Sequence, residues 1–397
     1  MPAKIAIEKL FKIFGEHPSR AFPLLEKGAG KEEIYKETGQ AVGLADVSFE
    51  VTEGEILVVM GLSGSGKSTL IRCVNRLIEP TLGQIKVDGQ DITKLDHQEL
   101  LEVRRKKFGM VFQNFALFPH RSVLANAEYG LEIQGVDPEQ RAQAARTALK
   151  QVGLEGWEEA TPEQLSGGMQ QRVGLARALA VDPDILLMDE AFSALDPLIR
   201  RDMQHELIGL QATVKKTIMF ITHDLDEALK IGDRIVLMKD GRVVQVGTPE
   251  DILTNPATRY VEKFVEDVDM SKVLTAESVM VKARVVAFPG DGPRTVLHKM
   301  KDEGISSIFV VSSDYHLLGY LTADQAAEAI KLGQKHIKDL IKPVPEVVRQ
   351  DEPVNQMFPV MAETTLPVPV LDQQDKLMGV VVRGSLLAGL AEGGIEQ

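Results

Sequence analysis

A glycine-rich segment with one lysine and neighbouring hydroxyl groups is the clearest chemical pattern in the sequence. The pattern G-x-x-x-x-G-K-[ST] occupies residues 61–68, after the apolar run 56–60 and before a helical pattern. Glycines let a backbone wrap around a phosphate and point N–H groups at it, and a helix start adds a positive dipole end. The segment therefore predicts a nucleoside triphosphate site. Its expected contact residues are Gly61, Ser63, Gly64, Ser65, Gly66, Lys67, Ser68 and Thr69.

A second segment ends in two adjacent carboxylates, Asp189 and Glu190, after the apolar run 185–188. If a buried strand brings Asp189 beside the phosphate loop, its carboxylate can hold Mg²⁺ together with the Ser68 hydroxyl. Glu190 would then be placed to polarise an attacking water. Acidic residues are common at strand ends in α/β proteins, so this pair indicates a catalytic site only in combination with the glycine-rich loop at residues 61–68. Together the two segments predict triphosphate hydrolysis.

Further motifs resemble, in order and residue type, those of the ABC family of ATPases. Residues 165–172 resemble the signature that distinguishes these enzymes, with Met169 where glutamine is commonest. The other matches are to the Q-loop glutamine, the D-loop aspartate, the switch histidine and an aromatic platform for adenine, at Gln113, Asp196, His223 and Phe14. The resemblance implies that the nucleotide is ATP. It also implies that Gln113, Glu190 and His223 serve hydrolysis, and that Gln113 joins Ser68 and Asp189 around Mg²⁺.

The same resemblance implies a site shared between two copies of the chain. Ser166, Gly167 and Gly168 of one copy would meet the γ-phosphate of an ATP bound by Lys67 of the other, with Asp196 at the same junction. ATP would then close a head-to-tail pair, and hydrolysis would reopen it.

These groups need elements that bring them to one place. Apolar runs alternate with helical patterns through residues 1–267, which predicts a largely parallel α/β sheet. Residues 16–40 are expected to form a charged helical insertion, and about 114–164 a helical subdomain.

The third region, about 276–392, contains an internal repeat. A shift of 60 residues aligns Asp291 with Asp351 and Gly319 with Gly379. Because one unit of this size cannot bury its apolar face alone, the copies at 276–334 and 335–392 are expected to pack as a pair.

Composition restricts the class of protein. The 397 residues suit two or three domains, and the 44% of apolar residues supply a core. A net charge of −13 argues against a nucleic-acid partner held by bulk charge. The single cysteine, Cys73, fits a reducing compartment, and the start of the chain lacks the apolar core of a signal peptide. We expect a soluble protein that reaches a membrane only through a partner or its surface.

The segments around the motifs closely resemble the ATP-binding subunit of glycine betaine/proline betaine importers. The matching segments are the insertion after Gly15, residues 75–80 and residues 189–200, and the repeat resembles tandem CBS domains. This resemblance implies an ABC-type P-loop ATPase domain with a helical subdomain, followed by a tandem α+β CBS domain. It also implies membrane permease subunits, a substrate-binding protein reached through them, and a peripheral position on the cytoplasmic face of the inner or plasma membrane.

Alternatives remain open on the sequence alone. The importer could carry another solute, such as methionine or a sugar, because residues of this chain do not touch the solute. A soluble ABC protein of translation or DNA repair is disfavoured by the single cassette and the short segment between Gln113 and Ser166. Residues 114–121 are expected either to form the groove that binds a permease helix or to pack in the core of the domain.

The repeat region is expected to regulate the ATPase in response to osmotic or ionic strength. CBS pairs usually contact adenosine through G-h-h-T-x-x-D, but here Asp324 stands one position early in the first copy, and the second copy lacks the pattern. A cyclic dinucleotide with other contacts remains a candidate. Four lysines fall at helical spacing: Lys331, Lys335, Lys338 and Lys342. They predict either a helix face that meets anionic lipid or a plain solvated face, and Gly333 between them could break the helix.

Overall fold

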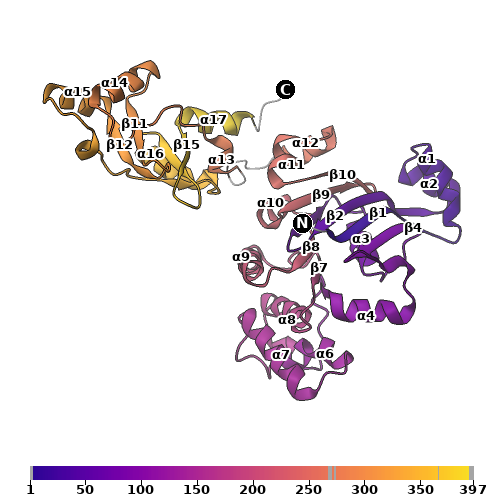
Figure 1. Ribbon diagram of the computed structural model, residues 1–397. Helices are drawn as coiled ribbons and strands as arrows, with labels where there is room; N and C mark the ends of the chain where they lie inside the picture. The colour runs from indigo at the N-terminus through magenta and orange to yellow at the C-terminus, as the bar shows by residue number, and fades with distance from the viewer. Residues whose placement is uncertain (1–2, 267–270, 272–273, 365, 393–397) are drawn as a thin grey trace. The chain divides into compact units, whose positions relative to one another are not determined.

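The chain divides into two compact units, residues 1–265 and 266–397. A computed structural model describes residues 3–266, 271, 274–364 and 366–392 (Figure 1). Within the described residues, no helix combines the length and the apolar character needed to cross a membrane.

The central sheet of the first unit is parallel except at one edge, with strand order β10-β9-β3-β8-β7-β6. The strands are β3 (Ile56–Met60), β6 (Phe108–Val111), β7 (Ile185–Asp189), β8 (Thr217–Ile221), β9 (Arg234–Lys239) and β10 (Arg242–Gly247). β3, β7 and β8 are buried along their whole length, as expected of strands covered on both faces. Their carboxyl ends meet at one edge, so the segments that follow them become neighbours.

A second, antiparallel sheet has the strand order β2-β1-β4-β5. Its strands are β1 (Ala3–Phe14), β2 (Ala41–Thr52), β4 (Leu82–Val87) and β5 (Gln90–Asp91). Residues 16–40 connect β1 to β2 through a 3₁₀ helix (Pro18–Ala21), α1 (Phe22–Glu26) and α2 (Lys31–Thr38). Figure 1 shows α1 and α2 together beside this sheet. They are fixed by a small core that contains Ile13, Ala21, Leu25, Ile34 and Val42.

A group of helices lies beside the sheets of this unit. α6, α7 and α8 lie together in Figure 1, below the sheets. Asp137 begins α7 by accepting a hydrogen bond from the Glu139 backbone, and Pro138 follows at the first helical position, where a missing N–H has no consequence. The helices of this unit from α3 on are α3 (Lys67–Val74), α4 (His97–Lys107), α5 (Val123–Ala127), α6 (Tyr129–Ile133), α7 (Pro138–Gln151), α8 (Gly167–Ala180), α9 (Pro197–Val214), α10 (Leu225–Ile231), α11 (Pro249–Thr254) and α12 (Arg259–Val265).

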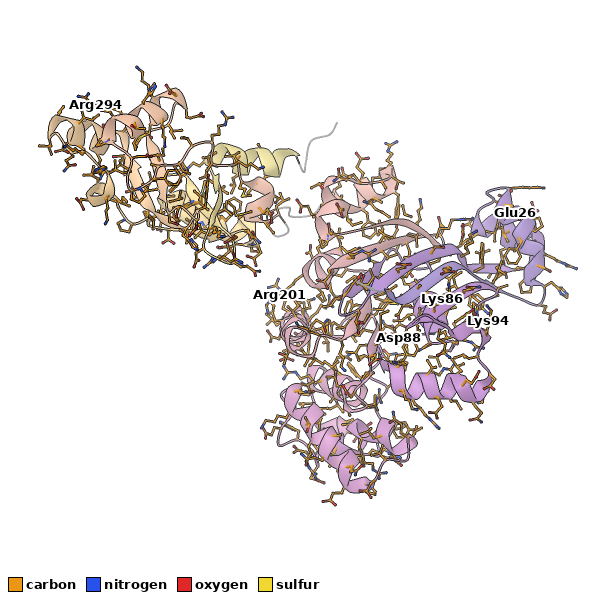
Figure 2. The ribbon with its side chains drawn as sticks, viewed as in Figure 1. Glu26, Lys86, Asp88, Lys94, Arg201 and Arg294 are labelled. Atoms are coloured by element: carbon orange, nitrogen blue, oxygen red, sulfur yellow. The ribbon has the colours of Figure 1, made fainter. Side chains whose placement is uncertain are left out.

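A network of ion pairs connects the antiparallel sheet to the start of β7, with two lysines each paired to the same two aspartates. The Lys4 ammonium lies 2.8 Å from Asp88 and 3.1 Å from Asp184, and that of Lys107 lies 2.9 Å and 2.6 Å from the same carboxylates. Asp88 is labelled in Figure 2. The hydrogen bond from Lys107 holds the pKa of Asp184 below its ordinary value, against burial, which raises it.

The second unit contains the internal repeat. Its elements are α13 (Ala276–Val279), α14 (Pro293–Asp302), β11 (Ser307–Val311), β12 (Leu317–Thr322), α15 (Ala323–Lys331), β13 (Val348–Arg349), α16 (Val354–Glu363), β14 (Val368–Leu371), β15 (Leu377–Val381) and α17 (Arg383–Glu392). β11 pairs with β12, and β14 with β15, both antiparallel. His316 bridges Lys376, the residue 60 positions further on, so the two copies meet at equivalent positions.

The copies exchange their opening segments. Val281, which precedes the first copy's strands, pairs with Val380 of the second, and Lys342, which precedes the second copy's strands, pairs with Tyr320 of the first. At Gly319, φ is 152°, and an added Cβ would overlap the Lys342 carbonyl oxygen. The segment that contains Lys342 crosses Gly319 closely and therefore explains this glycine.

The prediction of a single lysine-bearing helix is wrong. α15 ends at Lys331, and Gly333 turns the chain with a φ of 71°. Lys335 follows outside any helix, and Lys338 begins a separate 3₁₀ helix (Lys338–Leu340). Glycine readily adopts the left-handed conformation that ends a helix, and this outweighs the lysine spacing. The four lysines remain exposed, but on different elements.

Candidate active site

The phosphate loop between β3 and α3 depends on its glycines. Gly61 and Gly66 have φ angles of 147° and 105°. An added Cβ at Gly61 would overlap the Met238 carbonyl oxygen, and at Gly66 it would lie 2.6 Å from that of Gly43. The loop therefore turns tightly against two neighbouring strands, a position that only glycine fits without strain.

The loop surrounds polar groups that suit an anion. Lys67 is buried and its ammonium donates hydrogen bonds to the carbonyls of Gly61 (2.7 Å) and Leu62 (3.2 Å). Burial lowers the pKa of Lys67, while Glu190 and Asp189 act in the opposite direction. The Ser65 hydroxyl is buried and has no hydrogen-bond partner within the described residues. A buried cation and an unpaired hydroxyl fit a phosphate group.

Ser68 and Asp189 lie together although 121 positions separate them in the chain. The Ser68 hydroxyl donates to Asp189 Oδ1 at 3.0 Å, and Arg72 pairs with Oδ2 at 3.3 Å. Hydroxyl and carboxylate oxygens are ligands that Mg²⁺ accepts, usually together with phosphate oxygens and water. The described residues hold no cluster of three or more His, Cys, Asp or Glu side chains able to bind a metal. The donor set fits a Mg²⁺ ion that arrives with the nucleotide.

Glu190 is the meeting point of the expected catalytic residues. Its carboxylate lies 3.3 Å from His223 Nδ1, and the Gln113 amide donates to it at 3.4 Å. The Gln113 amide also donates to the Ser193 hydroxyl at 3.2 Å. Glu190 has a φ of 48°, an uncommon left-handed conformation that turns the chain sharply after β7. The structure thus brings the three residues together at the carboxyl edge of the sheet.

A pocket of about 710 Å³ lies beside the loop. Nine of the site residues expected from the sequence line this pocket: Phe14, Ser63, Gly64, Gly66, Lys67, Ser68, Thr69, Glu190 and His223. The Phe14 ring at its rim is 40% exposed, with the Lys12 ammonium 4.9 Å from the ring centroid. An exposed aromatic face is suited to stacking on a flat base.

The signature and D-loop residues lie elsewhere. Ser166 begins α8 and accepts a hydrogen bond from the Met169 backbone, and Asp196 begins α9 in the same way with Ile199. Ser166, Gly167, Gly168 and Asp196 are not among the described residues that line the pocket. One copy of the chain therefore does not bring them to the phosphate loop.

Sequence reasoning missed two residues beside the loop. The Lys31 ammonium, from the insertion, donates to the Gly64 carbonyl at 3.2 Å and lines the pocket. The Tyr260 hydroxyl is buried near the Leu62 backbone, and burial raises the pKa of this hydroxyl although the Leu62 backbone opposes the rise. Neither residue belongs to a motif, so only the three-dimensional arrangement identifies them.

Known proteins resemble this chain along almost its whole length. Residues 44–193 match the family model described as ABC transporter, and residues 276–332 and 337–392 each match the CBS domain model. The chain is 57% identical to the glycine betaine transport ATP-binding protein OpuAA of Bacillus subtilis (strain 168), over 98% of this chain and 93% of that protein. It belongs to the family of glycine betaine transport ATP-binding proteins.

Other members of the family match over the whole chain. The glycine betaine/proline betaine transport system ATP-binding protein ProV of Escherichia coli (strain K12) is 48% identical, over 100% of this chain and 99% of that protein. A solved structure titled as a dimeric post-hydrolysis state of the ATP-binding cassette MJ0796, bound to ADP and Pi, is 34% identical. Its TM-score is 0.52, over 62% of this chain and 98% of that chain. The predicted fold class and family are confirmed, and the chain is an ABC-type ATPase.

Proposed function

We propose that the chain is the ATP-hydrolysing subunit of an importer for quaternary amine osmolytes such as glycine betaine or proline betaine. The contact between Ser68 and Asp189, with Glu190 one residue further on, carries the ATPase part of the proposal. The solute comes from the full-length relatives, which are glycine betaine transport proteins by name. The match along the whole chain favours transport over the soluble translation and repair proteins, and it favours betaines over methionine or sugars.

Each residue has a role in the proposed reaction. Phe14 stacks on adenine, Lys67 and the loop N–H groups bind the phosphates, and Glu190 polarises the attacking water. Ser68, Asp189 and Gln113 would hold Mg²⁺, which when bound neutralises phosphate charge. His223 contacts the Glu190 carboxylate and so orients it beside the γ-phosphate.

A second copy of the chain would complete the site. Ser166 and the two following glycines start α8, where backbone N–H groups lack helical partners and can bind an anion. Because these residues do not line the pocket of their own copy, a head-to-tail pair is the arrangement that uses them. The solved structure of the cassette MJ0796 with ADP and Pi is dimeric.

The permease is proposed to dock in a separate pocket of about 600 Å³ between α4, α6 and α8. Its lining is mainly apolar and aromatic, including Phe112, Phe118, Tyr129 and Ile133. Ile133 is 49% exposed, which favours an interface at this pocket. Such docking would hold the chain at the cytoplasmic face of the membrane and connect it, through the permease, to a substrate-binding protein.

The repeat unit is proposed to regulate transport in response to osmotic or ionic strength. Thr322 caps α15 in a reciprocal pair with Gln325, the residue at the position of the usual acid. This pairing disfavours the usual adenosine contact and leaves a cyclic dinucleotide or an anionic lipid surface as the ligand. The exposed lysines of residues 331–342 supply the charge that either ligand would need.

Uptake of labelled solutes tests the proposal. In cells that carry the complete transporter, Lys67→Ala should abolish ATP-dependent uptake of glycine betaine while uptake of methionine and maltose continues. Unchanged glycine betaine uptake would overturn the assigned solute. Full ATPase activity of the purified variant would overturn the assigned site.

A further inference from the structure

Lys31 brings a second ammonium group to the nucleotide pocket. It is the first residue of α2, in the insertion between β1 and β2. Its ammonium donates a hydrogen bond to the Gly64 carbonyl at 3.2 Å, and its side chain lines the same pocket as Lys67 and Thr69. The insertion thus reaches the phosphate loop through a cation.

The surrounding structure fixes this lysine. Ile34, one turn further along α2, is fully buried in the core of the insertion. The Lys31 stem passes the turn between β9 and β10, where a Cβ added at Gly241 would lie 3.2 Å from Lys31 Cε. The Gly241 N–H donates to the Ser65 carbonyl at 2.9 Å, so the same turn supports the phosphate loop.

The electrostatic environment suits an anionic ligand. Burial lowers the pKa of Lys31, and Asp240 opposes this effect. A partly desolvated ammonium gains more from an anion than a fully hydrated one does, because the local dielectric constant is lower.

Lys31 and Lys67 are placed alike. Lys67 donates to the carbonyls of Gly61 and Leu62, and Lys31 donates to that of Gly64. All three acceptors are neutral and belong to one loop. A phosphate oxygen carries negative charge, so an ammonium gains a Coulomb attraction there that a neutral carbonyl does not supply.

We propose that Lys31 is a nucleotide-binding residue whose ammonium exchanges the Gly64 carbonyl for a phosphate oxygen of the bound nucleotide. The insertion would then contribute directly to affinity and respond to nucleotide occupancy. This inference rests on the ATP site proposed above.

Nucleotide binding to the purified full-length chain tests the inference. Dissociation constants for ATP, ADP and adenosine are measured by competition with a fluorescent ATP analogue, for the unmodified chain, Lys31→Gln, Lys31→Arg and Lys36→Gln. Lys36 is the matched control, because it lies on the same helix and its side chain is exposed. Lys31→Gln should weaken ATP and ADP binding about tenfold, the effect of losing one charge-assisted hydrogen bond.

Three further readouts separate ligand binding from support of the loop. Adenosine affinity and the melting temperature without nucleotide should stay unchanged in Lys31→Gln, and Lys31→Arg should restore most of the ATP affinity. Equal ATP affinity in Lys31→Gln and the unmodified chain would overturn the inference. So would a parallel loss of adenosine affinity and melting temperature. If the unmodified chain itself bound no ATP, the proposed ATP site would be wrong instead.

Discussion

The His223 Nδ1 atom lies 3.3 Å from Glu190 Oε2, although the two residues follow different strands. Parallel pairing of β7 with β8 sets Asp189 opposite Ile221, so the next residues of both segments emerge at the same edge. Gln113 reaches the same carboxylate after β6, the neighbour of β7 on its other side. Residues that follow three neighbouring strands thus meet at one carboxylate, which supports the proposal that Glu190 is the catalytic base.

Glu190→Gln should reduce ATP turnover by a factor of about 100 or more, because an amide cannot accept a proton from the attacking water. ATP binding should persist, since Lys67 and the loop are unchanged. Light scattering should then detect an ATP-dependent dimer that the unmodified chain forms only transiently. Glu37→Gln, an exposed carboxylate of the insertion, is the control and should hydrolyse ATP normally. Full turnover in Glu190→Gln would remove the assigned role.

Ser68→Ala should raise the Mg²⁺ concentration for half-maximal ATPase activity by about tenfold. The substitution removes one of the oxygen ligands proposed for Mg²⁺ and leaves Asp189 paired with Arg72 alone. A Mg²⁺ titration at saturating ATP measures the shift. Ser19→Ala, at an exposed position of the insertion, should titrate like the unmodified chain. An unchanged Mg²⁺ requirement in Ser68→Ala would exclude this hydroxyl as a ligand.

The sequence predicts the ATPase unit well because its motifs specify local geometry. A glycine-rich loop between a buried strand and a helix has few possible conformations. Parallel strands bring Asp189 and Glu190 to the edge of the sheet at which this loop lies. The shift of 60 residues likewise predicts paired copies, and the bridge between His316 and Lys376 follows from that symmetry.

The remaining features depend on contacts between distant segments. Lys31 belongs to an ordinary charged helix, and only the packing of that helix brings its ammonium to Gly64. The lysine spacing after residue 331 predicts one helix face, but Gly333 ends the helix there. No periodic pattern in the sequence predicts the exchange of opening segments between the copies, because it arises from pairing between distant segments.

Asp184→Asn should lower the unfolding midpoint in urea at neutral pH by an amount equivalent to about 0.5–1 kcal/mol, as expected for a partly exposed ion pair. The pKa of Asp184 is lowered in the folded chain, chiefly by the hydrogen bond from Lys107. Its contribution to stability is therefore complete above the unfolded pKa of about 4, and it is lost as the pH falls through the lower folded value. The difference from the unmodified chain should vanish in that acid range.

A matched control for this prediction is Asp182→Asn, two residues earlier. Asp182 pairs with Lys216, but its side chain is 88% exposed, so solvent screens the pair. Its urea midpoint should match that of the unmodified chain at every pH. A difference for Asp184→Asn that persisted at the lowest pH would show that its effect is not ionic.

Gly319→Ala should disrupt the crossing of the Lys342 segment over β12 in the repeat unit. The Tyr320 and Lys342 backbones exchange two hydrogen bonds there, of 2.9 Å and 3.0 Å, and a Cβ at residue 319 would push against the Lys342 carbonyl. We expect a local destabilisation of about 2 kcal/mol, which speeds hydrogen exchange of those two amides about 30-fold. Gly333→Ala separates the strain of a positive φ from the collision of the added Cβ. The φ of Gly333, 71°, is also positive, but a Cβ added there meets open space. Gly333→Ala should show only the backbone effect, a destabilisation of about 1 kcal/mol. Equal destabilisation by the two variants would show that the close approach of Lys342 is not the reason for glycine at position 319.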